Sequence, residues 1–167
     1  MNRRVSAVAV VGAALVGFAS CGVPAETVEP GVASLDGDFD RGALIIESDD
    51  GVSHKLEVYL ATKPEQQQRG LMFVRKMPQN VGMLFVYEDA GFHSMWMKNT
   101  YISLDMIFAK ADGSVSSVIH DTQPLSLTSQ GSIEEVSYVL EMNAGTARRL
   151  KIGRKSRIIW DATSISD

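Results

Sequence analysis

The sequence predicts a mostly β fold, either a β-sandwich or a small barrel-like sheet, with two short helices. Short apolar runs rich in β-prone residues recur between residues 42 and 160, and turn-forming residues separate them. Only two segments combine helix-capping residues with a helical run. Many short strands with frequent turns favour a sandwich or barrel over an α/β fold.

Each expected element has a local reason in the sequence. The apolar runs predict strands at 42–47, 54–60, 82–87, 92–98, 102–108, 114–119, 136–142 and 157–160. A helix is expected at 63–69, because Thr62 and Glu65 have the spacing of a capping box and Gly70 is a good stop signal. A second helix is expected within 143–152, with Asn143 as its N-cap. A polar loop is expected at 121–134.

Composition bounds the class of protein. The chain has 167 residues, 45% hydrophobic and 22% charged, which suits one domain with a real core. The formal net charge of −4 gives no indication of nucleic-acid binding. The single cysteine, Cys21, excludes an intramolecular disulfide and any multi-cysteine zinc or iron–sulfur site. The sequence implies no cofactor.

The N-terminus has the pattern of an export signal. MNRR is positively charged, and residues 5–20 then form a sixteen-residue run without a charge. This run is shorter than the ~20 residues of a membrane-spanning helix but suits a signal peptide. The segment from Phe18 to Cys21 resembles a bacterial lipobox, so we expect a signal peptide at 1–20 and lipid attachment at Cys21. An ordinary cleaved signal, with Val-Pro-Ala at 23–25, and an uncleaved anchor are the alternatives.

The remaining boundaries follow from composition. Residues 21–40 are rich in Pro, Gly and acids without periodicity, which predicts a flexible tether. Residues 41–167 are then expected to form one mostly β domain. The expected location is the periplasmic or cell-surface side of a membrane, with the membrane as a partner through the lipid anchor.

The segment 92–108 contains polar residues within two apolar runs. If 92–98 and 102–108 form a hairpin with a turn at 100–101, side-chain alternation separates two faces. Methionines occupy one face, while Trp96, Lys98, Ser103 and Asp105 occupy the other. A stacking residue beside a cation and an acid suits the lining of a small polar pocket. We expect Trp96, Lys98, Asn99 and Asp105 to line such a pocket.

Five motifs resemble a known family. RGLM (69–72), GMLFVY (82–87), WMKNT (96–100), LDMIF (104–108) and YVLEMNAG (138–145) occur in the order and spacing of the family called domain of unknown function 192. The resemblance covers about residues 56–158. It implies a compact, mostly β, barrel-like domain that is often exported, and it implies no established reaction.

Other residues are candidates outside the hairpin. Arg69 ends the first helix, where it either caps the helix or contacts an anion near Lys98. Glu141 lies in an apolar strand and needs a partner if it is buried, and Arg69 is the expected one. Asn143 opens a helix whose free N–H groups could hold an anion.

A Cu(I) site is an alternative interpretation of the methionine-rich strand. Cu(I) could bind to His93, Met95 and Met97, although methionine is also an ordinary core residue.

These observations favour binding over catalysis. The three histidines lie in separate elements, and the expected domain has no cysteine nucleophile. A Lys98–Asp105 acid–base pair is the remaining catalytic arrangement. The basic run 148–157 is expected to be a solvated face or a surface for anionic lipid or envelope polymer. We expect a non-enzymatic envelope binding module. A pocket for a small anionic or sugar-like ligand and a Cu(I)-handling protein are the alternatives.

Overall fold

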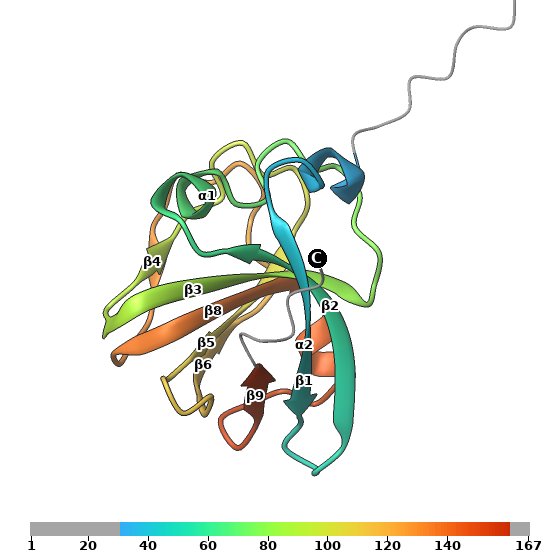
Figure 1. Cartoon of the computed structure of the whole chain (residues 1–167). Helices are drawn as coiled ribbons and strands as arrows, with labels where there is room; N and C mark the ends of the chain where they lie inside the picture. The colour runs from blue at the N-terminus through green and yellow to red at the C-terminus, as the bar shows by residue number, and fades with distance from the viewer. Residues whose placement is uncertain (1–30, 161–167) are drawn as a thin grey trace, which may run out of the picture.

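The computed structural model describes residues 31–160. The predicted signal peptide, Cys21 and the tether up to residue 30 lie outside the described residues. The predicted mostly β fold is confirmed, because a curled seven-stranded sheet and a two-stranded sheet are accompanied by only two short α-helices (Figure 1). The elements in order are η1 (Val32–Leu35), β1 (Asp40–Glu47), β2 (Ser53–Ala61), α1 (Pro64–Arg69), β3 (Val81–Gly91), β4 (Ser94–Met95), β5 (Leu104–Ala109), β6 (Val115–Ile119), β7 (Gln130–Gly131), β8 (Val136–Asn143), α2 (Thr146–Arg149) and β9 (Arg157–Trp160).

The large sheet has the strand order β6-β5-β8-β3-β2-β1-β9. Its neighbouring strands are antiparallel except β2 and β3, which are parallel and joined by the crossover that contains α1. The sheet curls until an isolated bridge between Ser114 and Arg157 joins its two edges. Figure 1 shows α1, η1 and several loops at one end of this half-barrel, and the β1–β2 turn at the other.

Side-chain alternation gives the central strands β5 and β8 two buried faces. On β8, Val139 belongs to one core cluster and Leu140 to the other. The same division separates Met106 from Ile107 on β5, whose six residues are all buried. Glu141 lies two residues beyond Val139 and therefore on the same face of β8. Both core clusters are formed by residues within 31–160.

The ordered domain begins earlier than the sequence predicts. Leu35 in η1 is fully buried and Phe39 is nearly so, and both belong to the first core cluster. Gln66 also donates from Nε2 to the backbone oxygen of Asp38 at 2.7 Å. The expectation of a flexible tether is therefore wrong for residues 31–40. The alternating acids Asp36, Asp38 and Asp40 make the segment look polar overall, although the buried side chains of Leu35 and Phe39 anchor it to the core.

The expected hairpin of 92–98 with 102–108 is wrong. β4 is only two residues long and pairs with β7, which lies in the predicted polar loop. β5 is flanked by β6 and β8, so neither of its edges is available to residues 92–98. The chain leaves the sheet after Met95 through a turn with Asn99 at a φ of 56°. Residues 96–103 therefore form a loop between β4 and β5, and they do not pair with β5 as a strand.

The first helix is confirmed, with a capping arrangement one residue later than predicted. The side-chain oxygen of Gln66 accepts hydrogen bonds from the backbone N–H groups of Thr62 and Lys63, each at 3.1 Å. Gly70 ends the helix at a φ of 47°, a conformation that favours glycine. In the part of the chain that is described, helices are too short or too polar to cross a membrane.

Candidate functional site

A narrow pocket lies where α1 and the following loop meet β3, β8 and the loop after β4. Its lining comprises Gln67, Gln68, Arg69, Gly70, Leu71, Met72, Phe85, Met95, Trp96, Lys98, Thr100 and Glu141. Its free volume of about 20 Å³ is room for one or two water molecules. Only the tip of a ligand fits without movement of the walls.

Glu141 is the buried acid of this pocket. It is 4% exposed, and its direct cross-strand neighbours are Met83 on β3 and Met106 on β5. Burial among these apolar side chains raises the pKa of the Glu141 carboxyl to about 8. The group is therefore mostly protonated at neutral pH and can donate one O–H hydrogen bond.

Arg69 is not the partner of Glu141. Its guanidinium forms an ion pair with Asp38 and stacks over the ring of Phe39 at 5.6 Å. The expected Arg69–Glu141 pair is therefore wrong, although both residues line the pocket. Among the described residues, no ion pair or hydrogen bond offsets the burial of the Glu141 carboxyl.

Trp96 and Lys98 form the outer rim of the pocket. Both side chains are exposed, and the Lys98 ammonium lies 5.0 Å from the centre of the Trp96 ring. This cation–π contact orients the ammonium without neutralising its charge. The alternation between Met95, Trp96, Met97 and Lys98 places the methionines in the core and the other two outside. Trp96, Lys98 and Arg69 thus line the same pocket.

A polar group lies in the wall behind Met95. The Tyr87 hydroxyl donates to the Met95 sulfur at 3.7 Å. Burial and, second, the nearby Glu141 charge raise the pKa of Tyr87 to about 12. The His93 ring stacks on Tyr87 with centroids 3.5 Å apart, and desolvation lowers the pKa of His93. The Tyr87 hydroxyl is therefore neutral at neutral pH and supplies no charge that would offset the Glu141 carboxyl.

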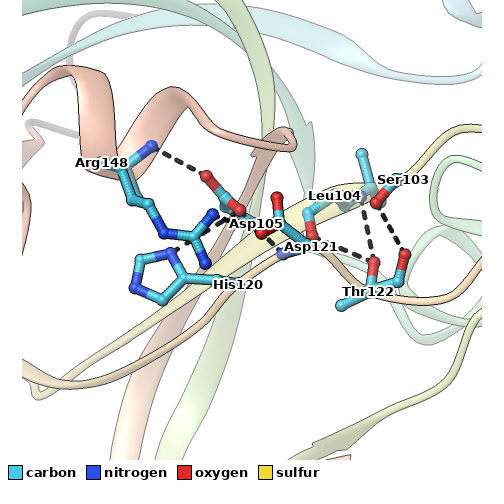
Figure 2. A network of polar contacts seen from close by, with 8 residues as sticks. Ser103, Leu104, Asp105, His120, Asp121, Thr122 and Arg148 are labelled. Carbon is cyan, nitrogen blue, oxygen red and sulfur yellow. Dashed lines mark hydrogen bonds and ion pairs between the residues drawn. The ribbon is translucent and has the colours of Figure 1, made fainter.

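Asp105 lies in a different place from Trp96 and Lys98. It is fully buried on the other face of β5, beside Ile107. Its carboxylate accepts hydrogen bonds from the backbone N–H groups of Asp121 at 3.0 Å and Ala147 at 2.8 Å. Figure 2 shows it among His120, Asp121 and Arg148. Asp105 therefore does not line the pocket, because the predicted hairpin that would have placed it there does not exist.

The two asparagines predicted as site residues, Asn99 and Asn143, make contacts that hold loops in place. Asn143 donates from Nδ2 to the backbone oxygens of Met77 at 2.9 Å and Pro78 at 3.1 Å, so it holds the loop before β3. The N-cap of α2 is Gly145, so the expected Asn143 cap is wrong. The Asn99 side chain contacts the Met72 sulfur at 3.9 Å, next to the pocket wall.

The basic run 148–157 is largely paired. Its contacts are Arg148 with Asp121, Lys151 with Asp50 at 2.8 Å, Arg154 with Glu134 at 3.8 Å, and Arg157 with the backbone oxygen of Asp112 at 2.7 Å. These cations tie α2 and β9 to neighbouring loops. The run is therefore a set of surface ion pairs and not a continuous positive face.

Two other arrangements compete less well as sites. A wider hollow of about 450 Å³ lies beside β9, but its charged residues Glu47, Asp112 and Arg157 are all exposed. Within residues 31–160, no group of three or more His, Cys, Asp or Glu residues is placed to hold a metal. Met83, Met95, Met97 and Met106 belong to the first core cluster. The Glu141 pocket is distinguished by a buried titratable group, which is a frequent mark of functional sites.

The curled β sheet and the buried acid define a small β domain whose narrow pocket contains a buried carboxyl. The family match then identifies it: the chain belongs to the DUF192 family, described as "Uncharacterized ACR", which matches residues 45–160. No curated protein matches the chain.

Two solved structures are similar to this chain. A protein from Sinorhizobium meliloti 1021, described as a proposed transcription regulator, is 38% identical with a TM-score of 0.71. The alignment covers 72% of this chain and 94% of that one. A protein of unknown function from Novosphingobium aromaticivorans DSM 12444 is 30% identical with a TM-score of 0.68. That alignment covers 71% of this chain and 84% of the other.

Proposed function

We propose that this protein is an exported, lipid-anchored binding module of the cell envelope, and that its pocket binds the carboxylate group of a small anionic ligand. The observation that carries the ligand assignment is Glu141, a buried carboxyl without a cationic partner among the described residues. Such a group costs stability, so its presence needs a reason beyond packing. The lipobox-like segment ending at Cys21 supports the envelope location.

The pocket offers an anion two kinds of interaction. Protonated Glu141 donates a hydrogen bond at the floor, and Lys98 and Arg69 supply positive charge near the rim. Arg69 already contacts Asp38, so Lys98 is the main uncompensated cation. The narrow floor admits a planar carboxylate more readily than a bulky ring.

A sugar-like ligand is less well supported. Sugars commonly stack on an open aromatic face, but the Lys98 ammonium lies over the Trp96 ring. A reaction is also less well supported by this lining. Its only hydroxyl belongs to Thr100, which donates to the backbone oxygen of Lys98 at 3.3 Å. We therefore assign binding and no catalytic step.

The test is a thermal-shift titration with formate, acetate, propionate and succinate. It is run at about pH 6.5 and about pH 9.5, on either side of the Glu141 pKa of about 8. A carboxylate at 100 times its Kd should stabilise the wild type by about 2.7 kcal/mol at the lower pH. The effect should fall at the higher pH, because ionised Glu141 repels the ligand.

Two variants of Glu141 test whether its side chain must donate a hydrogen bond for the ligand to bind. Glu141→Gln keeps a neutral donor and should bind carboxylates at both pH values, whereas Glu141→Leu should bind at neither. Glu135→Gln alters an exposed acid outside the pocket and should behave as wild type. Equal stabilisation of wild type and Glu141→Leu by the same carboxylate would place the site elsewhere.

A further inference from the structure

Exposed apolar side chains are concentrated on one group of loops. Ten large apolar residues are exposed within 31–160, and seven of them lie in the loops around β4 and β7 or after α1. We call these seven the apolar surface: Phe73, Phe92, Trp96, Tyr101, Leu125, Leu127 and Ile133. Phe92 is 71% exposed and Leu127 is 69% exposed. Clustered exposure of this kind marks an interaction site.

The loops that carry the apolar surface are held side by side. The backbone N–H of Phe73 donates to the oxygen of Asn99 at 2.8 Å. The N–H of Leu125 donates to the oxygen of Thr100 at 3.1 Å. The three loops that carry Phe73, Tyr101 and Leu125 therefore meet near residues 99–100.

The same loops continue toward the small sheet. Ser94 pairs with Gly131, and the N–H of Ser132 donates to the oxygen of His93 at 2.9 Å. Phe92 directly precedes His93, and Ile133 directly follows Ser132. The apolar surface is thus built on a connected backbone framework.

Charge near the centre of the apolar surface is basic. The sequence contains no Asp or Glu in 71–87, 90–104 or 122–133. Lys76 and Lys98 lie in these ranges and are exposed, and Arg75 stacks on Tyr101 at 4.1 Å. Trp and Tyr are enriched at membrane interfaces, where basic residues also attract anionic lipids. Apolar, aromatic and basic groups at the centre of the surface fit an anionic bilayer, while the acids Glu88, Asp89, Glu134 and Glu135 flank Phe92 and Ile133 in the sequence.

The place where the described chain begins fits the same partner. Gly31 forms an isolated bridge with Lys76, so the chain enters the domain beside the Phe73 loop. Ten residue steps separate Gly31 from Cys21, which can span at most about 35 Å. An anchor at Cys21 would hold these loops within reach of the membrane. By contrast, three of the six cations in the basic run 148–157 are held in ion pairs.

We propose that the apolar surface docks onto an anionic phospholipid membrane, with Trp96 in the interface. Trp96 and Lys98 also form the rim of the Glu141 pocket, so docking would turn the pocket mouth toward the bilayer. The inference goes beyond the proposed ligand site, and it holds whichever anion the pocket binds. It uses the proposed lipid anchor only to explain how the surface is brought close.

The two tryptophans of the chain allow a direct test. The full chain, produced in a bacterial host, is reconstituted into phosphatidylcholine–phosphatidylglycerol vesicles with brominated acyl chains, which quench nearby tryptophans. Trp160→Phe leaves Trp96 as the single tryptophan, while Trp96→Phe leaves Trp160, a half-buried residue at the end of β9 that pairs with Leu44 on β1. Trp96 should lose most of its emission relative to vesicles without bromine. Trp160 should lose little.

Three further samples decide between explanations. Leu125→Ser combined with Leu127→Ser, in the Trp160→Phe background, should reduce Trp96 quenching while the melting temperature stays unchanged. Vesicles of phosphatidylcholine alone should reduce it too. Glu141→Leu should leave it unchanged, which separates this inference from the ligand proposal. Trp96 emission that is unaffected by bromine would overturn membrane docking, and so would burial of Trp96 in a dimer of the chain.

Discussion

The Asp105 carboxylate on β5 accepts a hydrogen bond at 2.8 Å from the backbone N–H of Ala147 in α2. A second bond, from the N–H of Asp121 at 3.0 Å, reaches the other carboxylate oxygen. α2 has only four residues, and its N-cap Gly145 provides no side-chain cap. Asp105, which lies on a distant strand, therefore takes the place of a local side-chain cap for α2. Its two bonds join β5 to α2 and to the chain after β6.

Replacing Asp105 should test this role. Asp105→Asn keeps the size, but one oxygen becomes an NH₂ group that faces a backbone N–H donor. We expect the free energy of unfolding to fall by about 3 kcal/mol, as when a hydrogen bond to a buried charged group is lost. Urea unfolding measures it. Asp121→Asn removes only the exposed ion pair with Arg148 and should cost under about 1 kcal/mol. Equal losses in the two variants would show that the buried carboxylate has no special role.

Most strands were predictable because their signals are local. Residues 54–60 and 136–142 are short β-prone runs bounded by turns, and the structure places β2 and β8 there. The hairpin at 92–108 failed because pairing depends on competition between strands. β5 is buried on both faces and flanked by β6 and β8 on its two edges, which no local pattern of 92–108 could indicate.

The pocket was predictable in part for the same reason. Trp96 and Lys98 alternate with buried methionines, so their exposure follows from local spacing. Glu141 carried a signal as the single acid in an apolar strand, but its role depends on where Arg69 points. Arg69 turns to Asp38, a residue from a segment that the composition suggested was flexible. Which acid pairs with Arg69 depends on how distant segments of the chain pack, and only the tertiary structure shows this.

Glu141 should make stability depend on pH in a specific window. Its pKa is about 8 in the folded protein and close to 4.5 in the unfolded chain. Between these values the folded state holds a proton that the unfolded state has released, so stability falls as pH rises. Above pH 8 the loss is complete, and it amounts to several kcal/mol because one pKa unit is about 1.4 kcal/mol.

Glu141→Gln should remove this dependence. The variant should approach wild-type stability near the lower end of the window and exceed it near the upper end. Chemical unfolding at a series of pH values gives the difference between the two proteins, which cancels the contributions of other groups. Glu135→Gln is the matched control, since that acid is exposed. Parallel pH profiles for wild type and Glu141→Gln would contradict a buried, protonated Glu141.

The lipid anchor can be tested in cells. Radiolabelled palmitate should enter the wild-type protein and not Cys21→Ser, because Cys21 is the only cysteine in the chain. The wild type should also sediment with membranes after alkaline washing, which strips proteins held only by charge. Absence of label from the wild-type protein in its own host would show that the lipobox resemblance is misleading.

Lys98 should contribute to anion binding and little to folding. Its side chain is exposed and contacts the Trp96 ring at 5.0 Å, without an acid partner among the described residues. Lys98→Met keeps the apolar stem over the ring and removes the charge. We expect the free energy of unfolding to change by less than about 0.5 kcal/mol. The affinity for acetate at low salt should fall by about tenfold, or ~1.4 kcal/mol.

Lys155→Met provides the matched comparison for Lys98→Met, because Lys155 is exposed and lies outside the pocket lining. It changes the net charge equally, so a general electrostatic effect would weaken both variants to the same degree. A local effect weakens only Lys98→Met, and salt should diminish the difference between the variants by screening the exposed ammonium. Calorimetric titration with acetate at low and high salt measures both. Unchanged affinity in a folded Lys98→Met variant would remove Lys98 from the site.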